Sequence, residues 1–395
     1  MVCCRVDVGL HLLEAGGGAF TVEPGLFERL LRCYGSRARG VVEAMAAMGS
    51  RYYFRLNTKM GEKDPVLKEI SSTLRLAMGD ETLTEAAWFA AKERSLQLRG
   101  LKVVADKFAA EAVLRGAHLY ARGVKNCSGL KLGSEASVTD ENGRLAGVGI
   151  ARQSETSIRN YRQGLVVEID ENRYGLPSLM DTEWYAKGQI HPQSLPAMVT
   201  SHVLDPQPGE LIVDMNCAPG GKMSHLCQLT SNKARVVGFD RNELKISKTR
   251  TQLERLGCTN YNLVAYDSRY VDIDYSLKPD RILVDPPCTG LGVTPKLSVE
   301  TTMKDIDDLS GYQKQFLGAA SRMAKPGTRI VYSVCTITRE ECEDVVLFGT
   351  ESLGLELEPA EPMIGSSGGD PGGLTQRFDP DVHGLGFFIA CFRKT

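Results

Sequence analysis

The sequence predicts an α/β protein with a mostly parallel, Rossmann-like sheet in its C-terminal half, an N-terminal α/β segment and a small β-barrel module between them. From residue 195 onward, strand and helix patterns alternate, which is typical of parallel strands with helices on both faces. A glycine-rich turn at 216–222 follows the first of these strands, where such sheets bind ligands. Between 100 and 178, glycines separate short β-like runs, and this pattern predicts the barrel module.

Length and composition allow several domains with full cores. The chain has 395 residues, of which 42% are hydrophobic and 24% charged, as is ordinary for globular proteins. No stretch approaches the roughly 18 apolar residues that a membrane span needs, and the first residues lack the pattern of a secretory signal. We therefore expect a cytoplasmic protein with no membrane partner, divided into 1–99, 100–178 and 179–395.

The first part, 1–99, reads as helices around one clear strand. A Pro-Gly pair at 24–25 precedes an amphipathic helix over 26–34, and a second helix is expected near 39–47. The aromatic run 52–58 predicts a strand. Residues 62–95 are helical in pattern, with Leu67 and Ile70 on one face.

The second part, 100–178, contains short strands and one helix. Asp140 to Gly143 form a hairpin signal between two β-like runs. A short helix is expected over 108–115. The expected strands are 101–104, 136–139, 147–151 and 165–169. This part has more basic than acidic residues although the whole chain carries a net charge of −2, and a basic surface of this kind suits a polyanion partner.

The third part, 179–395, carries the alternating elements. The expected strands are 211–215, 235–240, 262–267, 281–285, 329–334 and 386–392. The expected helices are 223–229, 242–256, 305–324 and 339–348. Ligands of such sheets bind at the carboxyl ends of the strands. Asp214, Asp240, Asp267, Asp285 and Cys335 all fall there.

The turn after the first strand predicts a nucleotide-type cofactor other than a triphosphate or dinucleotide. Gly220 and Gly221 let the backbone approach a ligand, and the following helix N-terminus favours an anion. Both the phosphate-loop motif and the dinucleotide motif are absent from this turn. Asp240, which ends the second strand, lies where an acid binds ribose hydroxyls.

Together these residues suit S-adenosylmethionine. Lys222 and the turn amides are placed to hold its carboxylate, Asp267 to meet the adenine amine, and Lys245 to line the same cleft. The expected cofactor residues are Asn216, Cys217, Ala218, Pro219, Gly220, Gly221, Lys222, Asp240, Lys245, Asp267 and Asp285.

Two thiols indicate the reaction. Enzymes that methylate base nitrogens carry an aromatic residue after the Asp-Pro-Pro motif, but here that residue is Cys288. Carbon 5 of a pyrimidine is a weak nucleophile until a thiolate adds at carbon 6. The reaction therefore needs an activated thiol, a proton donor at ring nitrogen 3 and a base, and Cys335, Asp285 and Cys288 can supply these roles. The thiol must be partly ionised, so a lowered pKa is expected for it.

The remaining cysteines and histidines do not suggest a metal site. Eleven cysteines are present without any C-x-x-C pair, and six histidines are scattered. We expect reduced thiols, no structural metal, and no catalytic part for Cys3, Cys4, Cys33 and Cys391.

The motifs quoted so far resemble the Nop/Sun family of RNA 5-methylcytosine methyltransferases. The similarity covers about residue 190 to the end and includes Tyr332-Ser333-Val334-Cys335-Thr336 and Gly386-Phe387-Phe388-Ile389-Ala390. The resemblance implies that Cys335 is the nucleophile and that Cys288 aids product release. The chain departs from the family at Asn216-Cys217, where Cys-Ala is usual, and at Val334, where Thr is common.

The barrel module resembles a PUA domain, with 116–124 carrying the similarity. This arrangement is similar to the branch of the family that acts on tRNA, and it implies a target at position 72, with the PUA domain holding the CCA end. Candidate phosphate contacts are Lys102, Lys107, Arg115, Arg122, Lys125 and Lys131. Three alternatives stay open: the same reaction on ribosomal RNA, a catalytically inactive RNA-binding or assembly factor, and a small-molecule methyltransferase. The oligomeric state is also open.

Overall fold

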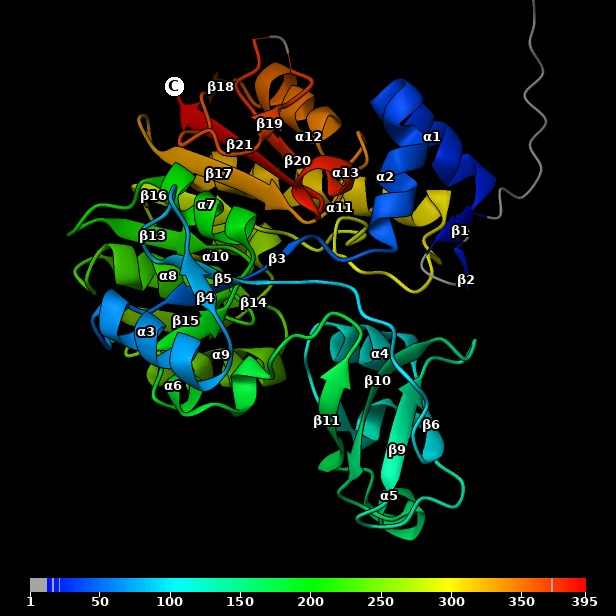
Figure 1. Ribbon diagram of the computed structural model, residues 1–395. Coiled ribbons are helices and arrows are strands. Elements are labelled where there is room, and N and C mark those ends of the chain that lie inside the picture. Colours follow the sequence, from blue (N-terminus) through cyan, green and yellow to red (C-terminus); the bar gives the residue numbers. More distant parts are fainter. Residues whose placement is uncertain (1–12, 16–17, 21, 371) are drawn as a thin grey trace, which may run out of the picture.

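The computed structural model describes residues 13–15, 18–20, 22–370 and 372–395 (Figure 1). Cys3 and Cys4, expected to take no part in the chemistry, lie outside these residues. Three larger sheets organise the chain: a nine-stranded one, a six-stranded one and a four-stranded one. Among the described residues, no helix combines the length and apolar character needed to cross a bilayer.

The nine-stranded sheet confirms the predicted, mostly parallel α/β domain. Its order is β15-β14-β13-β16-β17-β21-β20-β19, with β18 paired to β21. The first five strands in this order run parallel, and β21 pairs antiparallel with β17. The strands are β13 (Leu211–Asp214), β14 (Arg235–Asp240), β15 (Tyr261–Ala265), β16 (Arg281–Val284), β17 (Arg329–Val334), β18 (Leu355–Glu358), β19 (Ser366–Ser367), β20 (Gln376–Phe378) and β21 (Phe387–Lys394).

Helices cover both faces of this sheet. Apolar residues of α7, α8 and α9 pack on one face, and those of α11 pack on the other. The helices are α6 (Glu183–Ala186), α7 (Leu195–Leu204), α8 (Gly221–Leu229), α9 (Glu243–Arg255), α10 (Val271–Asp274), α11 (Met303–Met323), α12 (Glu343–Leu347) and α13 (Pro380–His383).

The helix predicted over 339–348 is wrong at its start. The α-helix α12 begins only at Glu343, because the preceding residues form a loop around the buried carboxylate of Glu341. The helix α7 was not predicted. It is buried along most of its length and lacks the amphipathic pattern that marks a surface helix.

The barrel module is a six-stranded sheet of order β7-β11-β10-β9-β6-β8. The predicted hairpin is confirmed, since β9 and β10 pair antiparallel across the turn at 140–143. Figure 1 shows the module below the rest of the chain, with α4 facing upward and α5 at the far end. Its elements are β6 (Leu101–Ala105), α4 (Lys107–Leu114), β7 (Leu119–Tyr120), β8 (Val124–Asn126), β9 (Glu135–Thr139), β10 (Leu145–Ala151), α5 (Glu155–Tyr161) and β11 (Leu165–Asn172).

The N-terminal segment differs from the prediction over 62–95. Only α3 is helical there, and two strands follow it, because β5 pairs with β3 through contacts that no local pattern reveals. The strand β12 (Ile190–Pro192) completes the sheet β12-β3-β5-β4 from beyond the barrel module. The elements are β1 (Leu13–Ala15), β2 (Gly18–Phe20), α1 (Pro24–Tyr34), α2 (Ala38–Met45), β3 (Arg51–Leu56), α3 (Lys63–Thr73), β4 (Ala77–Gly79) and β5 (Ala86–Ala90).

A buried arginine bonds this segment to the C-terminal half of the chain. Arg55 of β3 is fully buried and donates to Gly221 O at 3.0 Å and to Ser224 Oγ at 2.7 Å, both in the first turn of α8. Because α8 follows the glycine-rich turn, the N-terminal sheet fixes the position of that turn.

Glu85 forms a second buried bridge between the same two regions. Its Oε1 lies 2.6 Å from His202 Nε2 and 2.9 Å from His225 Nε2. Among the described residues, this is the group that brings three metal-type ligand atoms within 4.8 Å of one another. Two imidazoles directed at one carboxylate oxygen are also a self-sufficient hydrogen-bond bridge, and the absence of a metal stays a prediction.

Candidate active site

The candidate site lies where the strand order of the large sheet reverses. Chain order runs from β13 through β14 to β15 on one side and from β16 to β17 on the other, so β13 and β16 flank the switch point. Ligands of open α/β sheets bind in the crevice outside the strand ends at such a point. Asp214 ends β13 and Asp285 follows β16 there, which agrees with the predicted location.

The glycine-rich turn is tightly packed against β14. Cys217 is buried, and its N–H donates to Phe239 O at 2.9 Å. A Cβ placed on Gly238 would come within 2.7 Å of Met223 Sδ and 2.8 Å of Cys217 Cβ. Gly220 caps α8 with φ of 101°, a conformation that favours glycine. The turn is therefore rigid and presents the N-terminus of α8 to the crevice.

Two acceptors in this region are available to a cofactor. Asn216 Oδ1 is buried and has no hydrogen-bond partner among the described residues, although its own N–H donates to Asp214. One oxygen of Asp240 accepts from Asn242 N at 3.0 Å, and the structure gives its other oxygen no described donor. A nucleoside with an amino acid tail would supply donors to both, so these residues fit S-adenosylmethionine.

Two further predicted cofactor residues are Asp267, which follows β15, and Lys245, which lies on α9. Asp267 accepts two hydrogen bonds from the Arg269 guanidinium, and this contact lowers the pKa of Asp267. Lys245 is exposed on α9, where the described residues offer its ammonium no polar partner. Roles for both in cofactor binding stay predictions.

The structure brings the two predicted thiols into contact. Cys288 lies in the segment after β16, and Cys335 is the residue that follows β17. Their Sγ atoms are 3.4 Å apart. The parallel pairing of β16 and β17 brings both strand ends to one edge. The backbone also constrains this edge. Gly292 N–H donates to Cys335 O at 3.0 Å. A Cβ placed on Gly292 would lie 2.0 Å from Gly386 O, so the two segments approach closely only because this residue is glycine.

A charged group adjoins the thiols. Lys222 Nζ donates to Asp285 Oδ2 at 2.7 Å, and Ser333 Oγ donates to Asp285 Oδ1 at 2.9 Å. Lys222 is thus paired with Asp285, and its contact with the cofactor carboxylate stays a prediction. Sequence reasoning missed Ser333, which lies near the end of β17, two residues before Cys335.

These contacts divide the thiols into unequal partners. The hydrogen bond from Cys288 lowers the pKa of Cys335, with help from Lys222 and against burial and Asp285. The same hydrogen bond, followed by burial, raises the pKa of Cys288 well above its usual value. Burial, followed by the charge of Asp285, raises the pKa of the neighbouring Asp214 to about 7. Cys335 is thus the better thiolate and Cys288 the proton donor to it.

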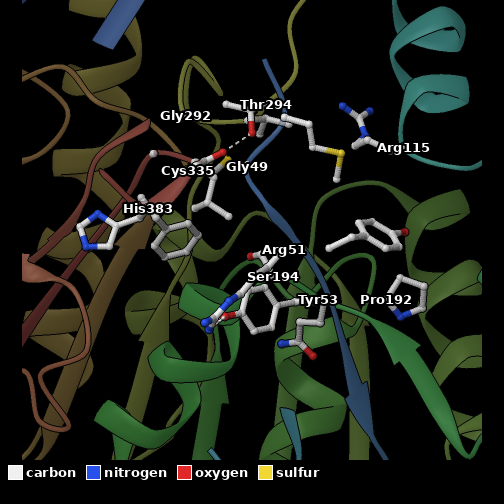
Figure 2. A pocket seen from close by; sticks show the side chains of 18 residues that line it. Gly49, Arg51, Tyr53, Arg115, Pro192, Ser194, Gly292, Thr294, Cys335 and His383 are labelled. Atoms are coloured by element: carbon white, nitrogen blue, oxygen red, sulfur yellow. Dashed lines mark hydrogen bonds between the residues drawn. The ribbon is translucent and has the colours of Figure 1, made fainter. Parts of the chain in front are cut away.

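Cys335 opens onto a pocket of about 310 Å³ (Figure 2). Aromatic walls from Tyr52, Tyr53 and Phe387 surround it. At the edge of the pocket, Thr294 Oγ1 donates a hydrogen bond of 2.6 Å to Gly384 O, drawn as a dashed line in Figure 2. A pocket of this size with aromatic walls suits one flat base placed against the sulfur.

A buried carboxylate that the sequence did not reveal holds the two thiol-bearing loops together. Glu341 is fully buried and accepts from Thr289, next to Cys288, and from Thr336, next to Cys335. The acceptor distances are 2.9 Å to Thr289 N, 2.6 Å to Thr289 Oγ1, 2.8 Å to Thr336 Oγ1, 2.9 Å to Thr338 Oγ1 and 2.9 Å to Gln313 Nε2. The sequence signal that could have indicated this contact is the pair Thr336 and Thr338, whose hydroxyls precede Glu341 and donate to it.

We expect Glu341→Gln to lower kcat about 10-fold while the affinity for a S-adenosylmethionine analogue stays within 2-fold. An amide cannot accept all these donors, so the loops separate and the thiols lose their contact. Each lost hydrogen bond to a charged group costs about 1.5–3 kcal/mol, so thermal denaturation should show a lower stability.

The matched control is Asp344→Asn, which removes a carboxylate whose side-chain donor among the described residues is the exposed Arg339, at 3.0 Å. It should leave kcat and stability nearly unchanged. Equal loss of activity in both variants would show that Glu341 does not position the thiols.

Comparisons with known proteins cover the whole site. The family model described as 16S rRNA methyltransferase RsmB/F matches residues 201–393, and the PUA domain model matches residues 101–172. A crystal structure of NSun6 from Pyrococcus horikoshii with SFG, an analogue of S-adenosylmethionine, superposes with a TM-score of 0.84 at 36% identity. It covers 93% of this chain and 97% of that one. The barrel module is therefore a PUA domain.

Three curated relatives mark how far the similarity extends. The chain is 37% identical over 380 residues to the tRNA (cytosine(72)-C(5))-methyltransferase of Pyrococcus horikoshii, covering 93% of this chain and 97% of that protein. It is 34% identical to the tRNA (cytosine(72)-C(5))-methyltransferase NSUN6 of Mus musculus, of which it spans 66%. The human 28S rRNA (cytosine(4447)-C(5))-methyltransferase is 35% identical but matches only 54% of this chain and 28% of its own length. The match to the first of these relatives thus extends over nearly the whole chain, whereas the match to the last covers about half of it.

Proposed function

This chain belongs to the RsmB/F family of S-adenosylmethionine-dependent RNA cytosine-5 methyltransferases, and we propose that it forms 5-methylcytosine at position 72 of tRNA, near the 3′ end of the acceptor stem. The observation that carries the proposal is the pair of sulfurs 3.4 Å apart beside a pocket that the PUA domain helps to line. The archaeal relative named for this reaction matches the chain over 97% of its length.

Cys335 supplies the nucleophile in this proposal. Its thiolate bonds to carbon 6 of the cytosine, and the displaced ring electrons make carbon 5 nucleophilic. Asp285 holds a proton at ring nitrogen 3, with Lys222, which donates to it at 2.7 Å, as the source of that proton. When bound, S-adenosylmethionine supplies the methyl group. Cys288, as its thiolate, then removes the proton from carbon 5. The bond between Cys335 and carbon 6 breaks with its electrons returning to the sulfur, and ring nitrogen 3 gives its proton back to the pair of Asp285 and Lys222.

The PUA domain supports tRNA as the substrate over ribosomal RNA. A base must leave its stack to reach Cys335, and unpairing costs least at the end of a helix. A PUA domain beside the pocket can hold the single-stranded CCA end while the terminal pair opens. A small-molecule substrate would leave this domain without a purpose, and the intact thiol pair argues against an inactive factor. We propose 1–99 as an N-terminal RNA-recognition segment, 100–178 as the PUA domain and 179–395 as the catalytic domain.

We expect a tRNA transcript to be methylated at cytosine 72 and removal of its CCA end to lower kcat/KM by at least about 10-fold, because stacking contacts of about 1–3 kcal/mol per base are lost. Labelled methyl donor measures the rate, and bisulfite sequencing maps the position.

A transcript with uridine at position 72 and a ribosomal RNA fragment serve as controls, and both should stay unlabelled. Faster labelling of the ribosomal fragment than of tRNA would favour the ribosomal alternative, and unchanged turnover without the CCA end would remove the assigned role of the PUA domain.

We further propose that the protein acts in the cytoplasm. Every cysteine in the described part of the chain is a free thiol, and the proposed chemistry needs Cys288 and Cys335 reduced. The cytosol keeps thiols reduced.

A further inference from the structure

One arginine of the PUA domain lies in the pocket beside Cys335. Arg115, the residue that caps the C-terminus of α4, lines the same pocket as Cys335, together with Met48 and Tyr52 from the N-terminal segment (Figure 2). The pocket is thus built by three parts of the chain, and Arg115 is the PUA residue that lines it.

The guanidinium of Arg115 has no partner among the described residues. Its Nη1 is buried and donates to no described residue, and the described part of the chain holds no ion pair within 4.0 Å to this side chain. Burying an unpaired charge is unfavourable, so such a group marks a place where an anion binds. The nearest acid, Glu111, is itself engaged, since its Oε1 accepts from Leu297 N at 2.9 Å.

A second cation lies close by and strengthens the positive field. Lys296, whose N–H donates to Met45 O at 2.8 Å, is half-buried beside the pocket. Burial lowers the pKa of Lys296. The charges of Lys107 and, to a smaller extent, Arg115 act in the same direction, against those of Glu111 and Cys335. Arg115 and Lys296 carry positive charges that repel each other, and Glu111 is one negative charge beside them. An anion that entered here would reduce this excess of positive charge.

We infer that Arg115 binds the backbone phosphate next to the target cytosine, so that the PUA domain completes the catalytic pocket rather than only holding the distant end of the RNA. This inference rests on the proposed function. A guanidinium presents two parallel N–H groups that match two phosphate oxygens, and a base seated against Cys335 brings its flanking phosphates to the rim of the pocket. Arg115 is a positioning residue: it fixes where the ribose and base lie relative to the sulfur.

The test combines protein and RNA changes. An acceptor-stem hairpin with a CCA end carries one uncharged methylphosphonate at either phosphate flanking the target cytosine. We expect one of these substitutions to lower kcat/KM about 10- to 100-fold in the wild-type protein, as loss of a charged hydrogen bond predicts. Arg115→Ala should lower kcat/KM on the unmodified RNA by the same factor. In this variant, introducing that methylphosphonate should lower kcat/KM by less than a further 2-fold. Arg115→Lys should retain part of the effect, because it keeps the charge without the fork.

The control is Arg159→Ala, which removes an exposed arginine on α5, paired with Glu155, at the far end of the PUA domain (Figure 1). This variant should respond to the methylphosphonate as the wild type does. If, at both positions, the methylphosphonate lowers kcat/KM of Arg115→Ala and Arg115→Lys as much as it lowers that of the wild type, Arg115 does not bind a flanking phosphate.

Fluorescence anisotropy of the same RNAs, without methyl donor, separates this inference from the proposed reaction. Coupling between Arg115 and one phosphate in binding, with no methylation of the RNA, would overturn the reaction and leave the contact in place. Methylation without coupling would overturn the contact and leave the reaction in place.

Discussion

Cys335→Ala should abolish methyl transfer to tRNA, with a loss of about 10⁴-fold or more, as is typical when a covalent nucleophile is removed. Without the sulfur, no bond forms at carbon 6, and carbon 5 stays too weak a nucleophile to accept a methyl group. Filter binding of labelled RNA measures the rate. Affinity for a S-adenosylmethionine analogue should change by less than 2-fold, because the described cofactor acceptors lie at the ends of β13 and β14.

The control for this variant is Cys391→Ala. Cys391 is fully buried in β21, opposite Val331 of the neighbouring strand, and its sulfur lies 3.0 Å from Arg329 Nε. Its removal leaves a small cavity and should lower stability by roughly 1–2 kcal/mol while activity persists. Methyl transfer at a normal rate in Cys335→Ala would disprove the assignment of the nucleophile.

The environment of Cys335 also predicts how quickly it is alkylated. Contact with Cys288 and the charge of Lys222 favour its thiolate, so iodoacetamide should modify Cys335 before the buried Cys217, whose pKa burial raises. Both residues are cysteines at the same edge of one sheet, so the expected difference in alkylation rate comes from the groups around each sulfur.

The reacting residues could be predicted because parallel strands end at one edge. Once strands over 211–215, 281–285 and 329–334 were expected, the residues that follow them had to converge, and the structure places Asp285, Cys288 and Cys335 together as this argument requires. The same reasoning located Asp240. Their chemical roles stay predictions.

The residues that could not be predicted depend on contacts between distant segments. Glu341 binds Thr289 across 52 positions of sequence, and Arg55 reaches Ser224 across 169. Local patterns carry no information about such pairs. The error over 62–95 has the same origin, because β5 is a strand only through its pairing with β3. The pairing of Lys222 with Asp285 likewise could not be predicted, because it depends on the neighbouring strand.

In the proposed reaction, the asymmetry between the two thiols sets the order of the steps. In the structure the hydrogen bond with Cys335 is the main cause that raises the pKa of Cys288, so Cys288 keeps its proton while Cys335 is a thiolate. Once Cys335 is bonded to carbon 6, its sulfur no longer carries a negative charge, and this cause disappears. Cys288 can then lose its proton to solvent water and act, as a thiolate, as the base at carbon 5. The order of events thus follows from the 3.4 Å contact between the sulfurs.

Cys288→Ala should therefore stop the enzyme after methyl transfer and before release. We expect a protein–RNA adduct that survives denaturing electrophoresis and approaches one RNA per protein, while steady-state turnover falls at least about 100-fold, the usual range for loss of a general base. The adduct should contain the labelled methyl group, because Cys335 and Asp285 remain in place to form it. Cys288→Ala combined with Cys335→Ala should give no adduct, which shows that the bond is to Cys335. If Cys288→Ala turned over at the wild-type rate, another group would have to remove the carbon-5 proton, and the pairing of the sulfurs would then serve only to activate Cys335.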